Sequence, residues 1–204
     1  MASERKDNIT SVINKCADYK KIIIMGLQRA GTHIVSEIIT RELVDSKNKY
    51  ILYKERFFGH TSCEIEKSNS SGTDIEDFIK NSSDYVLQAP SLLYKVEELP
   101  EECLVIFINR DKDEIRNSRK RSNWPGKSIE LLKYDTKDKG RFYENPTDLV
   151  DMQYEYWIKF QKDKIKNLAE IDFDALRKHP FWLDFSKRKD FTIGQTKDNG
   201  NWIK

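Results

Sequence analysis

"KIIIMGLQRAGTH", residues 21–33, decides the fold because it joins an apolar run to a glycine turn and then to a helical pattern. The run from Ile22 to Met25 is short and mostly β-branched, which is typical of a strand buried on both faces. After Thr32, apolar residues return at helical spacing, at Ile34, Val35, Ile38, Ile39 and Leu43. The stretch therefore predicts a strand, a tight turn and a helix in direct succession.

The turn has the features of an anion-binding loop. A helix N-terminus offers unpaired backbone N–H groups and the positive end of the helix dipole. Gly26 and Gly31 match the glycine spacing of the nucleotide loop GxxxxGK[ST], but Thr32 and His33 stand where that loop has its lysine and hydroxyl. ATP or GTP hydrolysis would lose both contacts, and the positive charge lies at Arg29 instead. Taken alone, the loop is equally consistent with a turn that binds no ligand.

A second candidate anion site follows the apolar run 104–108, which predicts another buried strand. Arg110 comes where this strand ends, Asp111 is a suitable helix cap, and Ser118 falls about two turns into the helix that follows. Singly, Arg110 and Ser118 fit an ion pair and a solvated helix face. Considered together with the first loop, Arg110 and Ser118 predict a binding site for a second phosphate. The basic run 119–121 is typical of a solvated face, with steering of an anionic donor as the alternative.

The rest of the chain alternates between strand and helix patterns. Further strands are predicted within 49–60 and over 84–87, a helix over 91–99, and one long amphipathic helix over 146–168 that packs Tyr154, Tyr156 and Trp157. Residues 61–74 are polar and read as a surface loop. This order predicts an α/β fold of one domain, 1–204, with 1–20 as an N-terminal extension or helix and a mainly parallel central sheet flanked by helices. Ligands of such sheets bind at the carboxyl ends of the strands.

Composition narrows the class of protein. Charged residues make up 34% of the chain, but the 36 basic and 34 acidic side chains leave a net charge of only +2, which argues against a general nucleic-acid coat. The sequence shows neither an apolar signal segment nor a membrane span, so we expect a soluble cytoplasmic protein. Three cysteines and three histidines are scattered without metal or disulfide spacing, so we expect reduced thiols and no metal.

Taken together, these motifs resemble those of sulfotransferases that use 3′-phosphoadenosine 5′-phosphosulfate (PAPS). "GLQRAGTHIV" resembles the family's 5′-phosphosulfate loop, written PKSGTTWL, and "FINRDKDEIRNS" resembles its 3′-phosphate element, VRDPRDVxxS. Residues 88–110 resemble the approach to that element, 171–180 its YEDLxxDP segment, and 194–204 the C-terminal loop ending in Gly-x-Trp. The chain departs from these motifs at Ala30, His33 and Lys112. The resemblance implies a P-loop NTPase-like sulfotransferase fold.

The resemblance also implies the ligand contacts. PAPS would be the donor, adenosine 3′,5′-bisphosphate the product, and no metal would be needed. Arg29 would stabilise the leaving phosphate, Lys197 would reach the 3′-phosphate, and Trp202 would stack on adenine or pin the C-terminal loop. The implied contacts to the donor are Gln28, Arg29, Ala30, Gly31, Thr32, His33, Arg110, Ser118, Lys197, Gly200, Asn201 and Trp202.

Transfer also requires a base and an acceptor. Glu55, in "YKERFFGH", resembles the glutamate that is the proposed base of carbohydrate sulfotransferases, and Phe57 and Phe58 would raise its pKa. A surface glutamate paired with a neighbouring cation is the alternative, and His60 is the reserve base. The acceptor would be a small molecule or carbohydrate with a hydroxyl or amine, and residues 123–145 are the segment where specificity is expected.

Two other functions stay open at this point. One is a P-loop kinase acting on a small metabolite, which Thr32 disfavours because it replaces the lysine. The other is a catalytically silent protein that keeps the adenosine bisphosphate pocket, which Ala30 and His33 allow.

Overall fold

The computed structural model describes residues 9–47, 50–54, 74–94, 96, 99–122, 149–158, 162–180, 196–198 and 201–203. In this part of the chain, seven strands form one sheet in the order β5-β4-β1-β3-β2-β6-β7. The strands are β1 (Lys21–Gly26), β2 (Ile51–Lys54), β3 (Tyr85–Gln88), β4 (Leu104–Asn109), β5 (Leu168–Asp172), β6 (Thr196–Asp198) and β7 (Asn201–Ile203).

The sheet is parallel except at one edge. Strands β5, β4, β1, β3 and β2 are parallel to their neighbours, β6 extends this set beside β2, and β7 is antiparallel to β6. The predicted α/β class with a mainly parallel sheet is confirmed. The chain places β2 and β3 on one side of β1 and β4 on the other, so the direction of winding changes at β1. Ligands of open α/β sheets bind outside the carboxyl ends of the strands at such a point.

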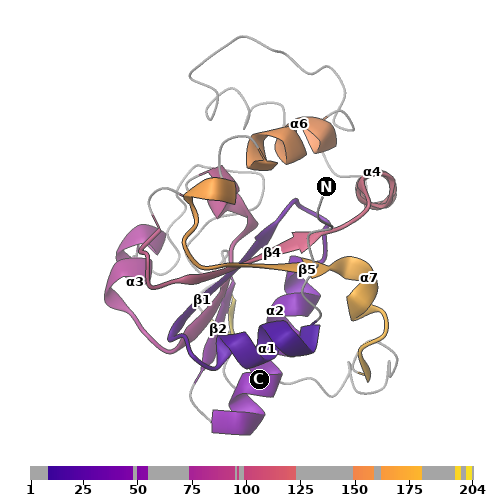
Figure 1. Ribbon diagram of the computed structural model, residues 1–204. Coiled ribbons are helices and arrows are strands. Elements are labelled where there is room, and N and C mark those ends of the chain that lie inside the picture. Colours follow the sequence, from indigo (N-terminus) through magenta and orange to yellow (C-terminus); the bar gives the residue numbers. More distant parts are fainter. Residues whose placement is uncertain are drawn as a thin grey trace.

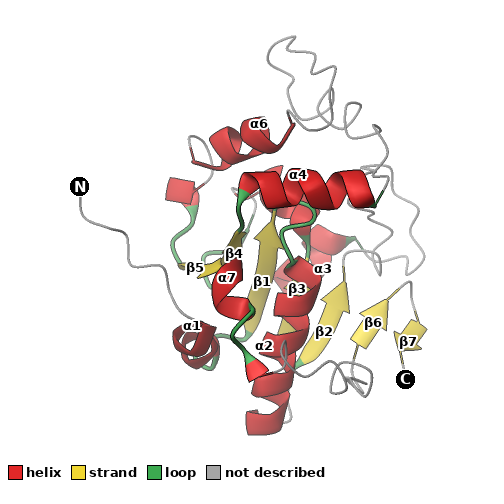
Figure 2. Cartoon of the chain, turned by 90° about the vertical axis from the view of Figure 1, so that its right-hand side faces the viewer, coloured by secondary structure: helices red, strands yellow, loops and turns green. Residues whose placement is uncertain are grey.

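Helices cover both faces of the sheet and its carboxyl edge. They are α1 (Ile9–Cys16), α2 (Thr32–Lys47), α3 (Ile75–Asn81), α4 (Lys112–Arg121), α6 (Leu149–Tyr156) and α7 (Phe173–Leu176), with 3-10 turns η2 (Pro90–Tyr94) and η5 (Lys162–Lys164). Helices α1 and α2 pack together on one face, and α3 lies on the other (Figure 1). Helices α4 and α6 lie across the carboxyl ends of the strands (Figure 2).

Strand β1 is the centre of the core because every one of its six residues is buried. Its last residue, Gly26, lies so close to β4 that a Cβ there would be 3.3 Å from the carbonyl oxygen of Ile108. On the α3 face, the ring of Phe78 lies 4.6 Å from that of Tyr53 and 4.9 Å from that of Tyr85. The close approach at Gly26 brings the carboxyl ends of β1 and β4 together.

Two predicted helices differ from the structure. The segment predicted as a helix over 91–99 begins with the 3-10 turn η2, in which Leu92 N donates to the Ala89 carbonyl. Pro90, the first residue of this turn, has no N–H to donate. A short 3-10 turn can begin at such a residue without losing a hydrogen bond of its own. The single helix predicted over 146–168 is wrong, because α6 ends at Tyr156 and Leu168 already belongs to β5.

Strand β5 forms because its backbone pairs with β4, from Val105↔Leu168 to Asn109↔Asp172. That ladder satisfies backbone N–H and C=O groups that a solvent-exposed helix end would leave open.

Helix α3 was not predicted. It begins at an N-cap, where the Asp74 carboxylate accepts a hydrogen bond from Glu76 N at 2.8 Å.

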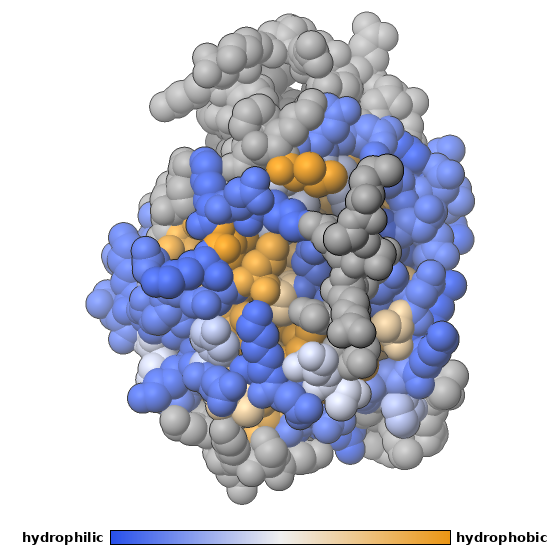
Figure 3. Space-filling view, in the orientation of Figure 1, coloured by the Kyte–Doolittle hydropathy of each residue, from blue (hydrophilic) through white to orange (hydrophobic). Residues whose placement is uncertain are grey.

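The described residues on the face drawn in Figure 3 are mostly polar, with a smaller apolar area among them. None of the helices in the described ranges has the length and apolar character needed to cross a membrane. The expectation of idle thiols is confirmed for Cys16 and Cys103, which are free and buried. Burial raises the pKa of the Cys16 thiol to about 12 and that of Cys103 to about 11. Cys63 lies outside the described residues.

Candidate functional site

The loop between β1 and α2, residues 27–31, turns sharply and directs backbone donors to one place. Ala30 N donates to the Leu27 carbonyl at 2.8 Å, and Arg29 and Gly31 have positive φ angles of 75° and 106°. The backbone N–H groups of Arg29, Gly31 and Thr32 have no acceptor among the described residues. Successive N–H groups in such a turn form a concave anion site, and the dipole of the 16-residue helix α2 adds to it.

Two guanidinium groups hold the carbonyls of this β1–α2 loop. Arg110 Nη1 donates to the Arg29 carbonyl at 2.7 Å, and Arg119 Nε donates to the Gln28 carbonyl at 3.3 Å. Both arginines belong to the segment formed by the end of β4 and α4. The carbonyl oxygens of Gln28 and Arg29 are therefore already occupied by guanidinium donors from this segment. What the loop leaves for a ligand is a set of donors.

Arg119 corrects the interpretation of residues 119–121 as a solvated face. Its side chain is only 3% exposed, and its Nη2 donates to Gln153 Oε1 at 2.7 Å. Lys120 and Arg121 are exposed, as expected. The reason for the difference is that α4 lies between the loop and α6, so one side of its last turns is covered.

The two predicted anion elements meet. Arg29 Nε donates to the Ser118 hydroxyl at 3.1 Å, although the two residues are 89 positions apart. Arg110 links to the same loop through the Arg29 carbonyl. The structure therefore brings Arg29, Arg110 and Ser118 to one place at the carboxyl ends of β1 and β4.

Side chains from two other segments hold Arg110 in place. The Tyr154 hydroxyl accepts a hydrogen bond from Arg110 N at 3.0 Å and donates one to the Arg110 carbonyl at 2.7 Å. The guanidinium carbon of Arg110 lies 4.0 Å from the centre of the Phe173 ring, a cation–π contact. The edge of the same ring limits Gly31, because a Cβ on Gly31 would be 2.5 Å from Phe173 Cε2. Residues Tyr154 and Phe173, from two distant segments, thus fix the position of Arg110.

Glu114 is the internal counterion of this arginine. Its Oε2 accepts from Arg110 Nε at 3.0 Å and from Arg177 Nη2 at 2.5 Å. The hydrogen bond from Arg177, followed by that from Arg110, lowers the pKa of the Glu114 carboxyl, while partial burial acts in the opposite direction. The carboxylate is therefore ionised at neutral pH, and an anion that approaches Arg110 competes with it.

The remaining predicted residues of the loop are placed as follows. Ala30 is fully buried, Gln28 and Thr32 are largely buried, and the side chain of His33 is exposed in the first turn of α2. The Thr32 hydroxyl accepts a hydrogen bond from Gln88 Nε2 at 3.0 Å. Gln88 was not predicted as part of the site, although its position at the end of a predicted strand was a usable signal.

Several predicted residues cannot be compared with the structure. Glu55, His60 and Gly200 lie outside the described residues, as does the segment 123–145. Strand β2 ends at Lys54, one residue before Glu55. For Lys197, Asn201 and Trp202 only the backbone is described, within β6 and β7, where Lys197 pairs with Tyr53 of β2.

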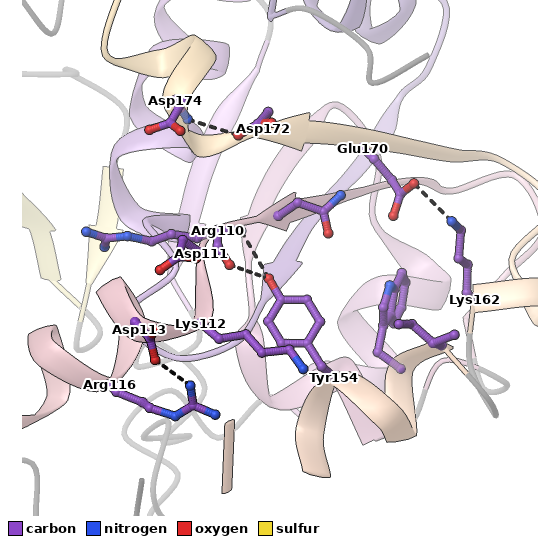
Figure 4. Close-up of a pocket in the computed structure, with 13 residues that line it drawn as sticks. Arg110, Asp111, Lys112, Asp113, Arg116, Tyr154, Lys162, Glu170, Asp172 and Asp174 are labelled. Atoms are coloured by element: carbon purple, nitrogen blue, oxygen red, sulfur yellow. Dashed lines mark hydrogen bonds and ion pairs between the residues drawn. The ribbon is translucent and has the colours of Figure 1, made fainter. Parts of the chain in front are cut away.

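A pocket of about 730 Å³, not predicted from the sequence, opens at the ends of β4 and β5 beside α4 and α6 (Figure 4). We call it the β4–β5 pocket. Its charged side chains pair with one another: Lys162 with Glu170 at 3.1 Å and Arg116 with Asp113 at 2.6 Å. Lys112, also in the lining, pairs with Asp151 at 2.7 Å. Arg110, which binds the Arg29 carbonyl of the loop, is one of the residues that line the pocket.

No group of His, Cys, Asp and Glu side chains that could hold a metal ion occurs among the described residues. Comparisons with protein-family models, with curated proteins and with solved structures found no match. Backbone donors, two arginines and a serine hydroxyl at one strand edge are suited to binding a phosphate or sulfate ester.

Proposed function

We propose that this protein is a sulfotransferase that moves a sulfuryl group from PAPS to a hydroxyl or amine of a small-molecule or carbohydrate acceptor. The observation that carries the proposal is the contact between the two anion elements. Arg29 Nε binds Ser118 Oγ at 3.1 Å, and Arg110 binds the Arg29 carbonyl at 2.7 Å. PAPS carries a 5′-phosphosulfate and a 3′-phosphate, so a donor-rich site built from two elements matches its two charged ends.

The reaction breaks the bond between sulfur and the oxygen of the 5′-phosphate and forms a bond from sulfur to the acceptor oxygen or nitrogen. The acceptor proton goes to a base, and adenosine 3′,5′-bisphosphate leaves. In this proposal Arg29 and the N–H groups of Gly31 and Thr32 stabilise the charge that develops on the leaving phosphate. Arg110 and Ser118 hold the 3′-phosphate and thereby orient the donor.

Ligand discrimination tests the proposal. We expect adenosine 3′,5′-bisphosphate at about 100 times its dissociation constant to raise the melting temperature by roughly 5 to 10 °C, while ATP with or without Mg²⁺ has a smaller effect. Arg110→Met should weaken this ligand about 10- to 100-fold, because a charged hydrogen-bond donor is lost. Arg116→Met in α4 is the matched control, since Arg116 pairs with Asp113 and Asp151 and its replacement should leave the affinity unchanged.

The outcomes separate the candidate functions. A stabilisation by Mg²⁺ and ATP alone, with ATP turnover, would overturn the proposal in favour of a small-metabolite kinase. Tight binding of adenosine 3′,5′-bisphosphate with no PAPS consumption across a panel of hydroxyl and amine acceptors would point to a silent binding protein.

Glu55 is the proposed base, and its variant tests the chemical step. Glu55 directly follows Lys54, whose backbone partner on β3 is Gln88, the residue that binds Thr32 of the loop. We expect Glu55→Gln to lower the turnover of PAPS by at least about 100-fold with little change in affinity for the product nucleotide. Glu37→Gln is the control, because it removes another carboxylate near this strand end, the one that pairs with Lys54 at 3.4 Å. Near wild-type turnover of Glu55→Gln would exclude Glu55 and make His60 the next candidate.

A further inference from the structure

Gln88 is a buried amide at the carboxyl end of β3. It ends β3, between Ile24 of β1 and Lys54 of β2, and is 2% exposed. Its Nε2 donates to the Thr32 hydroxyl at 3.0 Å. Its Oε1 is buried and has no hydrogen-bond partner among the described residues. A buried carbonyl without a partner is destabilising, so the amide calls for a reason other than packing.

The reason lies in what the hydrogen bond does to Thr32. A hydroxyl has one hydrogen to donate and two lone pairs to accept with. Gln88 occupies a lone pair of Thr32 Oγ1, and the hydroxyl hydrogen has no acceptor in the described ranges. Thr32 is the first residue of α2 and is 4% exposed, and its own N–H and those of Arg29 and Gly31 are likewise without acceptors there.

We propose that Gln88 is a positioning residue that holds the Thr32 hydroxyl as a hydrogen-bond donor to the anion bound in the β1–α2 loop. This rests on the proposed function for the identity of the anion, the 5′-phosphosulfate of PAPS. Hydrogen bonds in a chain strengthen one another, so donation from Gln88 makes the hydroxyl a better donor. The amide hydrogen also carries partial positive charge, which opposes a cation at Thr32 Oγ1.

The test compares wild type with Gln88→Met, Thr32→Val and the double variant, using calorimetric titration with adenosine 3′,5′-bisphosphate and, separately, inorganic pyrophosphate. We expect Gln88→Met to keep or raise the melting temperature, because the unpaired carbonyl is gone. It should lower the affinity for both probes about 3- to 10-fold. Thr32→Val should weaken them at least as much. The double variant should bind no more weakly than Thr32→Val, since Gln88 acts only through the hydroxyl.

Thr40→Val is the matched control, because the buried Thr40 hydroxyl donates to the Ser36 carbonyl at 2.7 Å within the same helix. It should leave both affinities unchanged. Wild-type affinities in Gln88→Met, or additive losses in the double variant, would overturn the positioning role. If wild type binds pyrophosphate but not the nucleotide, the proposed function fails while pyrophosphate still reports on Gln88. Binding of neither probe by wild type overturns both proposals.

Discussion

The β1–α2 loop and the β4–β5 pocket lie at the same edge of the sheet and differ in how their charges are balanced. In the loop, the N–H groups of Arg29, Gly31 and Thr32 have no acceptor among the described residues. In the pocket, cations and carboxylates already pair, as Lys162 does with Glu170 at 3.1 Å. The pocket has a volume of about 730 Å³, but the loop has the donors.

This difference teaches that volume alone does not identify an anion site. An ion pair already formed within the protein must be broken or bypassed before its cation can bind a ligand, which costs free energy. A backbone donor without an acceptor gains a hydrogen bond when an anion arrives. Substitutions in the loop should therefore change both stability and anion binding. Substitutions of the pocket's ion-paired side chains other than Arg110 should change stability slightly and anion binding not at all.

The largest effect is expected from Gly31→Ala. Gly31 has a φ of 106°, and an added Cβ would lie 2.5 Å from Phe173 Cε2. Backbone strain and the steric clash together should lower the free energy of unfolding by about 3 kcal/mol or more. The affinity for adenosine 3′,5′-bisphosphate should fall at least about 10-fold, because the donors move. Chemical denaturation and titration measure the two effects.

A second variant separates the two causes. Phe173→Leu combined with Gly31→Ala should recover the part of the stability lost to the clash, but not the part due to φ. A Gly31→Ala protein as stable as wild type would show that the loop is less constrained than this geometry implies.

An intermediate effect, of the opposite sign on binding, is expected from Glu114→Gln. Removal of the carboxylate that binds Arg110 and Arg177 should raise the affinity for adenosine 3′,5′-bisphosphate about 3- to 10-fold, because the 3′-phosphate no longer displaces a charge. Titration at constant ionic strength measures it. Weaker binding in Glu114→Gln would mean that Glu114 aligns Arg110 for the ligand rather than competing with it.

The same variant has a defined pH dependence. The folded protein holds the pKa of Glu114 below its ordinary value of 4.5, so the ionised carboxylate stabilises the fold above about that pH. This contribution is lost as the pH falls through the lowered pKa. The stability difference between wild type and Glu114→Gln should therefore be full at neutral pH and should shrink in acid. A difference that is constant from neutral pH to pH 3 would contradict the assignment.

The smallest effect is expected from Lys162→Met in the β4–β5 pocket. Lys162 pairs with Glu170 at the surface of the pocket, and such partly exposed pairs contribute about 0 to 1 kcal/mol. The affinity for adenosine 3′,5′-bisphosphate should stay as in wild type. A loss of nucleotide affinity in this variant would extend the binding site into the pocket and remove the contrast between the two regions.

The strands β1 and β4 and the loop between β1 and α2 could be predicted from the sequence because their signals are local. The run Ile22 to Met25 and the run 104–108 are apolar throughout, and both are buried strands in the structure. The spacing of Gly26 and Gly31 and the change to a helical pattern at Thr32 place the turn. Arg110 and Ser118 follow from the end of one of these strands and from the spacing along a helix.

Strand β5 was missed because its signal is weak along the chain. Its residues Leu168 to Asp172 alternate in burial, but the helix predicted over 146–168 takes in Leu168, and no strand is predicted over 169–172. The decisive interaction is the hydrogen-bond ladder with β4, more than 60 residues earlier in the chain. Without β5, neither α7 with Phe173 nor the β4–β5 pocket could be placed.

The sequence by itself determined that a strand, a glycine turn and a helix follow one another, because backbone conformation and helix ends depend on neighbouring residues. Only the tertiary structure decided which side chains meet at that geometry. Contacts between Arg29 and Ser118, Gln88 and Thr32, and Phe173 and Gly31 join segments far apart in the chain. They exist because parallel strands bring their carboxyl ends to one edge, and the order of strands in the sheet is set by packing of the whole core rather than by any local pattern.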